Sequence, residues 1–222
     1  MKVLLTGAAL SVIGVTAAQA DAIILNPGFE LGNVDFTSGY TYSSNLVPEG
    51  TYYIAGGSAA FNPYWTVNVT PHSGNDFMII NGDPTAGVTV YNQGNIAVLP
   101  DTQYYFSAWV TALSTPSPAI LQFSINGTAI NSPLTISPDV GVWQELYVPW
   151  YSGSAITADI SLLNENTALQ GNDFGLDDLA LSTTVPTVPE PLTLSIFGAG
   201  LAGAVALRRR KRKSSDELSL VV

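Results

Sequence analysis

The sequence of 222 residues has no cysteine and a single histidine, His72. Without cysteine the chain can form no disulfide bond, no thiolate metal site and no cysteine nucleophile. One histidine excludes a multi-histidine metal centre within one chain. Charged residues are also scarce, at 11% against 46% hydrophobic residues, so the composition fits neither a disordered acidic chain nor a long surface helix.

Basic residues are missing from most of the chain. The seven lysines and arginines are Lys2 and the cluster at 208–213, whereas residues 21–190 have none and hold 15 of the 17 acids. We therefore expect no nucleic acid partner, because this stretch cannot neutralise phosphates. Repulsion among so many carboxylates is destabilising unless they are spread out or bind cations, and calcium with its oxygen ligands is the natural counter-ion.

Residues 1–20 have the features of a secretory signal peptide. Lys2 precedes an apolar run at 3–18, and the run ends in the small-residue pattern of Ala18 and Ala20. We expect signal peptidase to cleave after Ala20. The alternative is a first transmembrane helix, but the run is short and rich in alanine, glycine and threonine.

Three features follow one another after the central part of the chain. Residues 183–191 form a linker rich in threonine, valine and proline. Residues 192–207 are almost all apolar or small and would make a short transmembrane helix of about 24 Å. The basic tail at 208–222 follows directly, and the positive-inside rule places it in the cytoplasm and the preceding domain across the membrane.

This order of parts resembles the PEP-CTERM sorting signal of exported proteins from Gram-negative bacteria that make extracellular polysaccharide. In that family an exosortase, a membrane protease-transpeptidase, recognises the Pro-Glu-Pro region and processes the tail, so the resemblance implies an exosortase partner. The family usually stops near the basic cluster, whereas this chain continues through 214–222. A plain single-pass anchor is the alternative. The sorting residues are Pro189, Glu190, Pro191, Arg208, Arg209 and Arg210.

Residues 21–182 have the pattern of an all-β domain. Apolar and aromatic runs alternate with turn pairs such as Asn81-Gly82, and no window shows a capped helical stripe. Short strands in this number predict a two-sheet sandwich of jelly-roll type. The expected strands are 23–25, 52–55, 65–69, 77–80, 88–92, 103–113, 119–125, 144–148, 156–163 and 175–182.

The run at 103–113 has the two-residue alternation of a half-buried strand. The even-numbered residues from Tyr104 to Ala112 are apolar and are expected to face the core. The odd-numbered residues between them, which include Trp109, are mixed. Their face of the sheet is expected to be partly open to water or to a ligand.

Three short motifs resemble galactose-binding-like jelly rolls, which include several families of carbohydrate-binding modules. They are LNPGFE at 25–30, HSGN at 72–75 and DDLAL at 177–181. In those jelly rolls the first and last strands commonly meet at a structural calcium. The alternative is that the acids are ordinary solvated edge residues. By position, the resemblance implies calcium ligands at Glu30 and Asp178, with Gly28, Ser73 and Asn75 as further candidates.

The sequence shows no catalytic constellation. His72 would need an aligned serine and acid, and its neighbour Ser73 on a turn is poorly placed to serve as its nucleophile. Asp177 and Asp178 are adjacent on the last expected strand, where successive side chains point to opposite faces, so they are not expected to flank a scissile bond. We therefore predict no catalytic residues.

Sugar binding suits this composition better than catalysis does. Aromatic faces stack on sugar rings, and amide and hydroxyl side chains bond to sugar hydroxyls, so no positive charge is required. Because β-sandwiches also fill their cores with aromatic residues, most of the clustered aromatics here should be core or rim. The candidate glycan contacts are Tyr42, Trp65, Trp109 and Trp150.

Together, these features predict an exported, non-catalytic, polysaccharide-binding protein of a Gram-negative bacterium. It would pass through an inner-membrane intermediate to the cell surface, outer envelope or extracellular matrix and associate with exopolysaccharide or biofilm. Two alternatives remain open. Two acids in a cleft would favour a secreted glycan hydrolase or lyase, and association without any glycan would favour a self-assembling surface protein.

Overall fold

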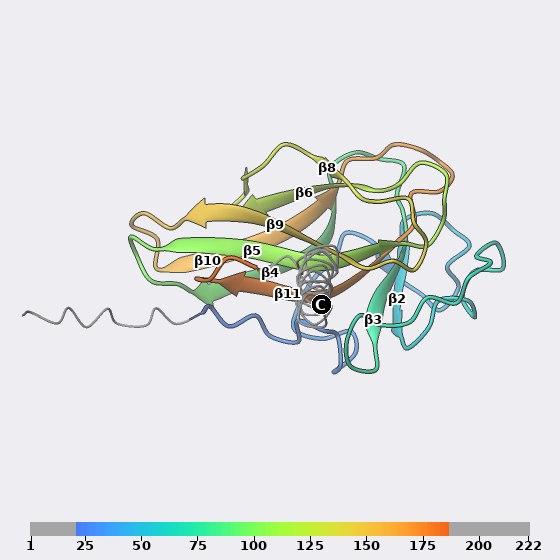
Figure 1. Ribbon diagram of the computed structural model, residues 1–222, viewed down its shortest axis with the longest axis horizontal. Helices are drawn as coiled ribbons and strands as arrows, with labels where there is room; N and C mark the ends of the chain where they lie inside the picture. The colour runs from blue at the N-terminus through green and yellow to red at the C-terminus, as the bar shows by residue number, and fades with distance from the viewer. Residues whose placement is uncertain (1–20, 187–222) are drawn as a thin grey trace, which may run out of the picture. The chain divides into compact units, whose positions relative to one another are not determined.

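The computed structural model describes residues 21–186, shown in colour in Figure 1. The predicted signal peptide, transmembrane helix and basic tail lie outside the described residues. Residues 21–186 form strands, turns and loops, and no helix in this range could span a membrane.

The strands form two sheets. Apart from the parallel pair β1–β2, the strands in them pair antiparallel. The six-stranded sheet has the order β1 (Thr41–Tyr42), β2 (Thr51–Ala55), β3 (Phe77–Asn81), β11 (Phe174–Ser182), β5 (Gln103–Ala112) and β9 (Gln144–Tyr151). The five-stranded sheet has the order β4 (Val88–Ala97), β10 (Thr157–Asn164), β6 (Ile120–Ile125) and β7 (Thr128–Ala129), with β8 (Leu134–Thr135) also on β6.

The path of the chain confirms the predicted all-β jelly-roll sandwich. From β3 onward the long strands alternate between the two sheets, so that β3, β5, β9 and β11 lie in one sheet and β4, β6 and β10 in the other. Strands that are neighbours in the sequence therefore face one another across the core. Figure 1 shows β11, the last strand, running through the middle of its sheet beside β5.

The main hydrophobic core lies between the sheets. The even-numbered side chains of β5 are buried in it, as their alternation predicted. Phe106 of β5 meets Phe123 of β6 edge to face, with ring centroids 4.9 Å apart. Burial of these apolar side chains removes them from water and is the main stabilising contribution to the sandwich.

A second, smaller core covers the outer face of the six-stranded sheet. Met78 and Ile80 of β3 join the main core, so Phe77 and Ile79 between them point outward. The long connection between β2 and β3, residues 56–76, packs Trp65 and other apolar side chains against this outer face. The same connection brings both candidate sites described below to the sheet.

Two expected strands are wrong. Residues 65–69 form a loop whose backbone groups bond within the 56–76 connection instead of to a strand. The Ser58 N–H donates to the Val69 carbonyl, and the Val69 N–H donates to Ser58 Oγ, each at 3.0 Å. Residues 23–25 join no strand, since the Leu25 N–H donates to the Gln93 side chain at 2.9 Å. The other expected strands are present with shifted ends, and the two-residue strands β1, β7 and β8 were not expected.

Candidate functional site

The three motifs singled out in the sequence meet at one point, the turn at residues 72–76. Asp177 Oδ2 accepts hydrogen bonds from the backbone N–H groups of His72 at 2.9 Å and Ser73 at 3.3 Å. Asp178 binds the side chains of the same two residues, with Oδ2 2.7 Å from His72 Nδ1 and Oδ1 accepting from Ser73 Oγ at 2.9 Å. Two adjacent carboxylates thus hold the first half of the turn.

Glu30 holds the second half of the turn. Its Oε1 accepts the backbone N–H groups of Asn75 at 2.8 Å and Asp76 at 3.0 Å, and its Oε2 accepts from Asn75 Nδ2 at 3.1 Å. Gly74, with φ of 63°, lies against the Glu30 carboxylate, where a Cβ would collide with it. These N–H donors lower the pKa of Glu30. We call Glu30, Asp177 and Asp178 the carboxylate clamp.

A β-bulge explains why both aspartates reach the turn, and it makes the expectation of opposite faces wrong. The register between β11 and β5 shifts between Asp177 and Ala180, and Asp178 has φ of 42°. The Asp178 N–H donates to Asp177 Oδ1 at 2.9 Å. The strict alternation of a strand does not survive such a bulge, so both carboxylates turn toward residues 72–76.

Asp177 is fully buried within the clamp. Burial raises its pKa to about 7, and the charge of Asp178 acts in the same direction. The backbone N–H groups of His72, Ser73 and Asp178 oppose this shift. The three carboxyl groups of the clamp therefore converge on a turn whose N–H and O–H groups donate to them.

The predicted calcium ligands Glu30, Asp178, Gly28, Ser73 and Asn75 all lie at or beside the clamp. A Cβ on Gly28 would stand 3.2 Å from Asp178 Oδ1, so the backbone passes close to this carboxylate. N–H and O–H groups already donate to both acids, and no group of three or more His, Asp or Glu side chains in residues 21–186 is arranged to hold a metal. The calcium site stays a prediction.

Calcium is expected to raise the melting temperature of the purified protein by several degrees over a chelator, since a ligand that binds only the folded state stabilises it. Glu30→Ala and Asp178→Ala should abolish this shift. Asp139→Ala, which removes an exposed acid far along the chain, should retain it. Identical melting curves with calcium and with chelator would show that the predicted calcium site is wrong.

His72 lies flat on Trp109 of β5, with ring centroids 3.7 Å apart and an angle of 13° between the planes. Trp143 packs edge-on to the imidazole at 5.9 Å. The hydroxyl of Ser73 and the imidazole bond to the same carboxylate rather than to each other. This arrangement orients the turn and does not form a serine–histidine nucleophile pair.

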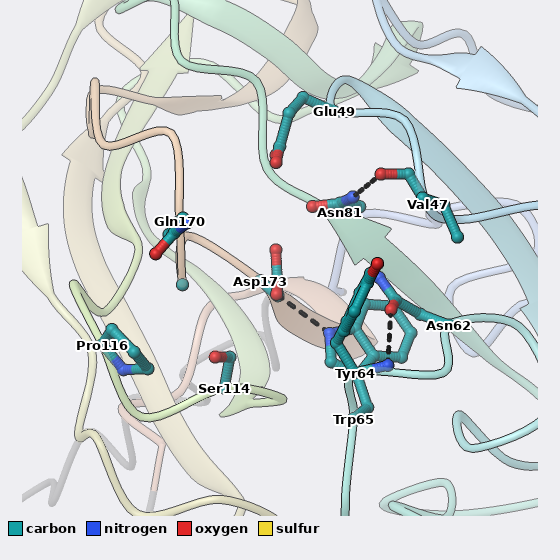
Figure 2. Close-up of a pocket in the computed structure, with 11 residues that line it drawn as sticks. Val47, Glu49, Asn62, Tyr64, Trp65, Asn81, Ser114, Pro116, Gln170 and Asp173 are labelled. Atoms are coloured by element: carbon teal, nitrogen blue, oxygen red, sulfur yellow. Dashed lines mark hydrogen bonds between the residues drawn. The ribbon is translucent and has the colours of Figure 1, made fainter.

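A second candidate site is a pocket of about 520 Å³, which we call the acidic pocket (Figure 2). It lies where four loops meet: the segment before β2, the 56–76 connection, the β5–β6 loop and the β10–β11 loop. The side chains from these loops converge on one space, although they are far apart in the sequence. Its lining residues are Val47, Glu49, Asn62, Tyr64, Trp65, Asn81, Ser114, Pro116, Gln170, Gly171 and Asp173.

Asp173 lines the acidic pocket and is only 8% exposed. Its Oδ2 accepts the indole N–H of Trp65 at 2.9 Å, and its Oδ1 accepts the Gly82 N–H at 3.4 Å. Burial raises the pKa of Asp173, and the two N–H donors oppose this shift. In Figure 2 the carboxylate oxygen that is not bonded to Trp65 is directed toward Glu49 and Asn81.

Glu49 faces Asp173 from the opposite side of the acidic pocket, with its carboxylate directed inward in Figure 2. Burial raises the pKa of Glu49 to about 7, and the charges of Asp173 and Asp83 add to the shift. Within residues 21–186, no hydrogen-bond donor reaches the Glu49 carboxylate. This carboxylate is therefore available to a ligand.

The polar groups of the acidic pocket are held in place by the backbone. Asn62 Nδ2 and Asn81 Nδ2 both donate to the Leu46 carbonyl, at 2.8 and 2.9 Å. The Tyr64 N–H donates to Asn62 Oδ1 at 3.0 Å, and Tyr64, which lines the pocket, is 78% exposed. The site thus combines ordered amides with an exposed aromatic ring.

The four candidate glycan contacts do not form one site. Trp65 lines the acidic pocket but is only 6% exposed, and Trp109 lies beneath His72. Tyr42 is 43% exposed and stacks on Tyr53, whereas Trp150 packs against the main core. Sequence reasoning missed Glu49, Asn62, Asn81, Gln170 and Asp173 as pocket residues, because no local motif joins them.

Comparison with solved structures gives one likeness that supports the fold, a cyclase, and a weaker likeness to a pair of CBM22 domains. A Stig cyclase, Fisc from Fischerella sp. TAU, solved with an indole compound, is 12% identical over 74% of this chain and 98% of its own, with a TM-score of 0.53. The tandem CBM22 domains of Xyn10C from Paenibacillus barcinonensis are 16% identical, with 78% of this chain and 50% of theirs covered and a TM-score of 0.49. At such identities the likeness concerns the fold alone.

Comparison of the sequence with protein families identifies a sorting motif. Residues 187–211 match the PEP-CTERM protein-sorting motif, which confirms the resemblance seen in the sequence. No curated protein matches the chain. The molecule is therefore a jelly-roll β-sandwich protein with a PEP-CTERM motif, and this motif marks it as an exported protein that an exosortase sorts to the cell surface.

Proposed function

We propose that this exported protein binds carbohydrate without turning it over, and that the acidic pocket is its glycan site. The observation that carries the proposal is the convergence of an exposed tyrosine, ordered amides and two carboxylates on one pocket of about 520 Å³. Pockets of this size accommodate small ligands, and a few fixed polar groups give them specificity.

The lining of the acidic pocket suits the two faces of a sugar ring. Tyr64 offers an exposed aromatic face on which the C–H face of a pyranose can stack. Asn62, Gln170 and Asp173 supply groups that can bond to ring hydroxyls. Because the asparagine amides are already held by the Leu46 carbonyl, little side-chain entropy is lost when the sugar binds.

Tyr64→Ala is expected to weaken glycan binding at least about tenfold, as truncation of a central aromatic contact does. A glycan array first identifies a bound sugar, and calorimetry with that sugar then compares the variants. The melting temperature should not change, since Tyr64 is largely exposed. Tyr151→Ala, at a tyrosine that is 58% exposed and outside the pocket, is the matched control.

Two results would contradict this proposal. If Tyr151→Ala lowers affinity and Tyr64→Ala does not, the glycan site lies elsewhere on the sandwich. If no glycan on the array binds the folded protein, carbohydrate binding itself is wrong, and self-assembly becomes the leading function.

The cellular part of the proposal extends the sorting motif. Signal peptidase would remove residues 1–20, the protein would pause as an inner-membrane intermediate, and it would then associate with exopolysaccharide in the outer envelope or matrix of a Gram-negative bacterium. Deletion of residues 189–191 should retain the protein in the inner-membrane fraction. The same fractionation with an exosortase-deficient strain should give the same result.

A glycan hydrolase is the second candidate, because one observation favours it. Glu49 has a pKa of about 7 and shares the acidic pocket with Asp173, and glycosidases use an acid that is protonated near neutrality beside a second carboxylate. Asp173, however, is deeply buried and already accepts two N–H groups. Release of reducing ends from the bound glycan would favour this candidate over simple binding.

A further inference from the structure

We infer that the acidic pocket selects sugars that carry a protonated amine, such as de-N-acetylated amino sugars, over N-acetylated or uronic-acid sugars. The inference rests on the proposed function and names its ligand class. It follows from the charges that face the pocket and from the amines that the chain lacks.

The groups around the pocket carry charge of one sign. Glu49 reaches in from the segment before β2, Asp173 rises from the segment before β11, and Asp83 follows β3. The hydroxyl of Tyr40 also lies here, where it accepts the Asp83 N–H at 3.1 Å. Residues 21–186 contain no lysine or arginine that could neutralise these acids. A positive charge at this site must come from a ligand.

A sugar ammonium group matches the groups left open in the pocket. It carries three N–H donors and one positive charge, while Glu49 receives no hydrogen bond from the described residues. The attraction is stronger here than at an open surface, because the pocket lowers the local dielectric. Bonds between a charged donor and a carboxylate are also stronger than neutral ones.

Other sugars lack this complement. N-acetylation removes the positive charge and leaves a single amide donor. A uronate or a sulfate places a negative charge beside Glu49 and Asp173, and like charges brought together at an interface lower affinity. Neutral sugars can still stack on Tyr64, so we expect a preference rather than absolute selectivity.

The protonation of Glu49 supports this inference. Without a ligand, burial and the neighbouring acids hold its pKa at about 7, so much of it is protonated at neutral pH. A bound ammonium group favours the ionised form of Glu49. Below the pKa of Glu49, binding of the amine must therefore displace the proton of this carboxyl group. Affinity for the amine should therefore pass through a maximum near neutral pH, because a lower pH protonates Glu49 and a higher pH removes the proton of the sugar amine. Affinity for an N-acetylated sugar should not follow this curve.

The experiment uses the mature exported protein and two probes of equal length, a chitosan oligosaccharide and its fully N-acetylated counterpart. Calorimetry at pH 7 should show the chitosan probe binding at least about tenfold more tightly, a preference that weakens as salt is added. Glu49→Gln should abolish most of this preference. Glu165→Gln removes the same charge from outside the pocket and should retain it.

Asp83→Asn provides a second variant. It should reduce the preference for chitosan less than Glu49→Gln does, because Asp83 contributes charge without lining the pocket. A uronic-acid oligosaccharide should bind more weakly than either probe. If the N-acetylated probe binds as tightly as chitosan, or if folded Glu49→Gln keeps the preference, the inference is wrong while carbohydrate binding stands. If no glycan of any class binds, both the inference and the proposed function are wrong.

Discussion

Asp177→Ala is expected to destabilise the protein by about 3 kcal/mol or more at pH 7. Asp177 is fully buried and accepts three backbone N–H groups, from His72, Ser73 and Asp178. These N–H groups are partly buried, and each one left without an acceptor costs about 1–3 kcal/mol, while removal of the buried carboxylate offsets part of this total. Urea denaturation, with the midpoint and slope compared to the parent protein, measures the loss.

Two further variants make this prediction specific to the carboxylate clamp. Asp139→Ala removes an exposed acid and should change the free energy of unfolding by no more than about 0.5 kcal/mol. Asp177→Asn keeps the shape of the side chain but turns an NH₂ group toward N–H donors. Its free energy of unfolding should therefore lie between those of Asp177→Ala and Asp139→Ala. If Asp177→Ala and Asp139→Ala unfold at the same urea concentration, the clamp contributes nothing to stability.

Gly171→Ala is the second large effect, again about 3 kcal/mol or more. Gly171 has φ of 85°, a conformation that costs an alanine about 1–2 kcal/mol. A Cβ at this position would also collide with the carbonyl of Pro116, which is backbone and cannot rotate away. Both residues line the acidic pocket, so the collision would displace its wall and weaken glycan binding as well.

Gly127→Ala is the matched control for Gly171→Ala. Gly127 has φ of 73°, but nothing lies within 4 Å of the position of its Cβ. It should therefore show the cost of the left-handed backbone alone, about 1–2 kcal/mol, with glycan binding unchanged. Equal destabilisation by the two substitutions would mean that the β5–β6 loop, which contains Pro116, moves away from the added methyl group with no loss of stability.

The fold was largely predictable because its signals are local. Alternation along 103–113 identified the core face of β5, and apolar runs bounded by turn residues identified the other long strands. The 65–69 run misled for a reason that no local pattern reveals. A loop buries its apolar residues against the outer face of the six-stranded sheet. Burial in a loop requires Trp65 and Val69 to be apolar just as burial in a strand does.

The candidate sites were predictable only where a motif marked them. The motifs at 25–30, 72–75 and 177–181 do meet, but the bulge at Asp178 interrupts the side-chain alternation on which the expectation for the acid pair rested. The acidic pocket gave no such sign. Glu49 and Asp173 are 124 positions apart in the sequence, and only the jelly-roll path brings them together.

The position of β11 has a mechanical consequence. Asp173, which lines the acidic pocket, immediately precedes this strand, and the tether to the sorting motif follows its last residue, Ser182. If a surface-held tail and a pocket-bound polysaccharide are pulled apart, the tension runs along the ~30 Å length of β11. Because β11 pairs with β5 along most of its length and with β3 over Phe174–Leu176, its hydrogen bonds would have to shear together instead of peeling apart one at a time. If the acidic pocket binds polysaccharide as proposed, the jelly-roll order loads β11 in shear, the geometry in which a sheet resists force best.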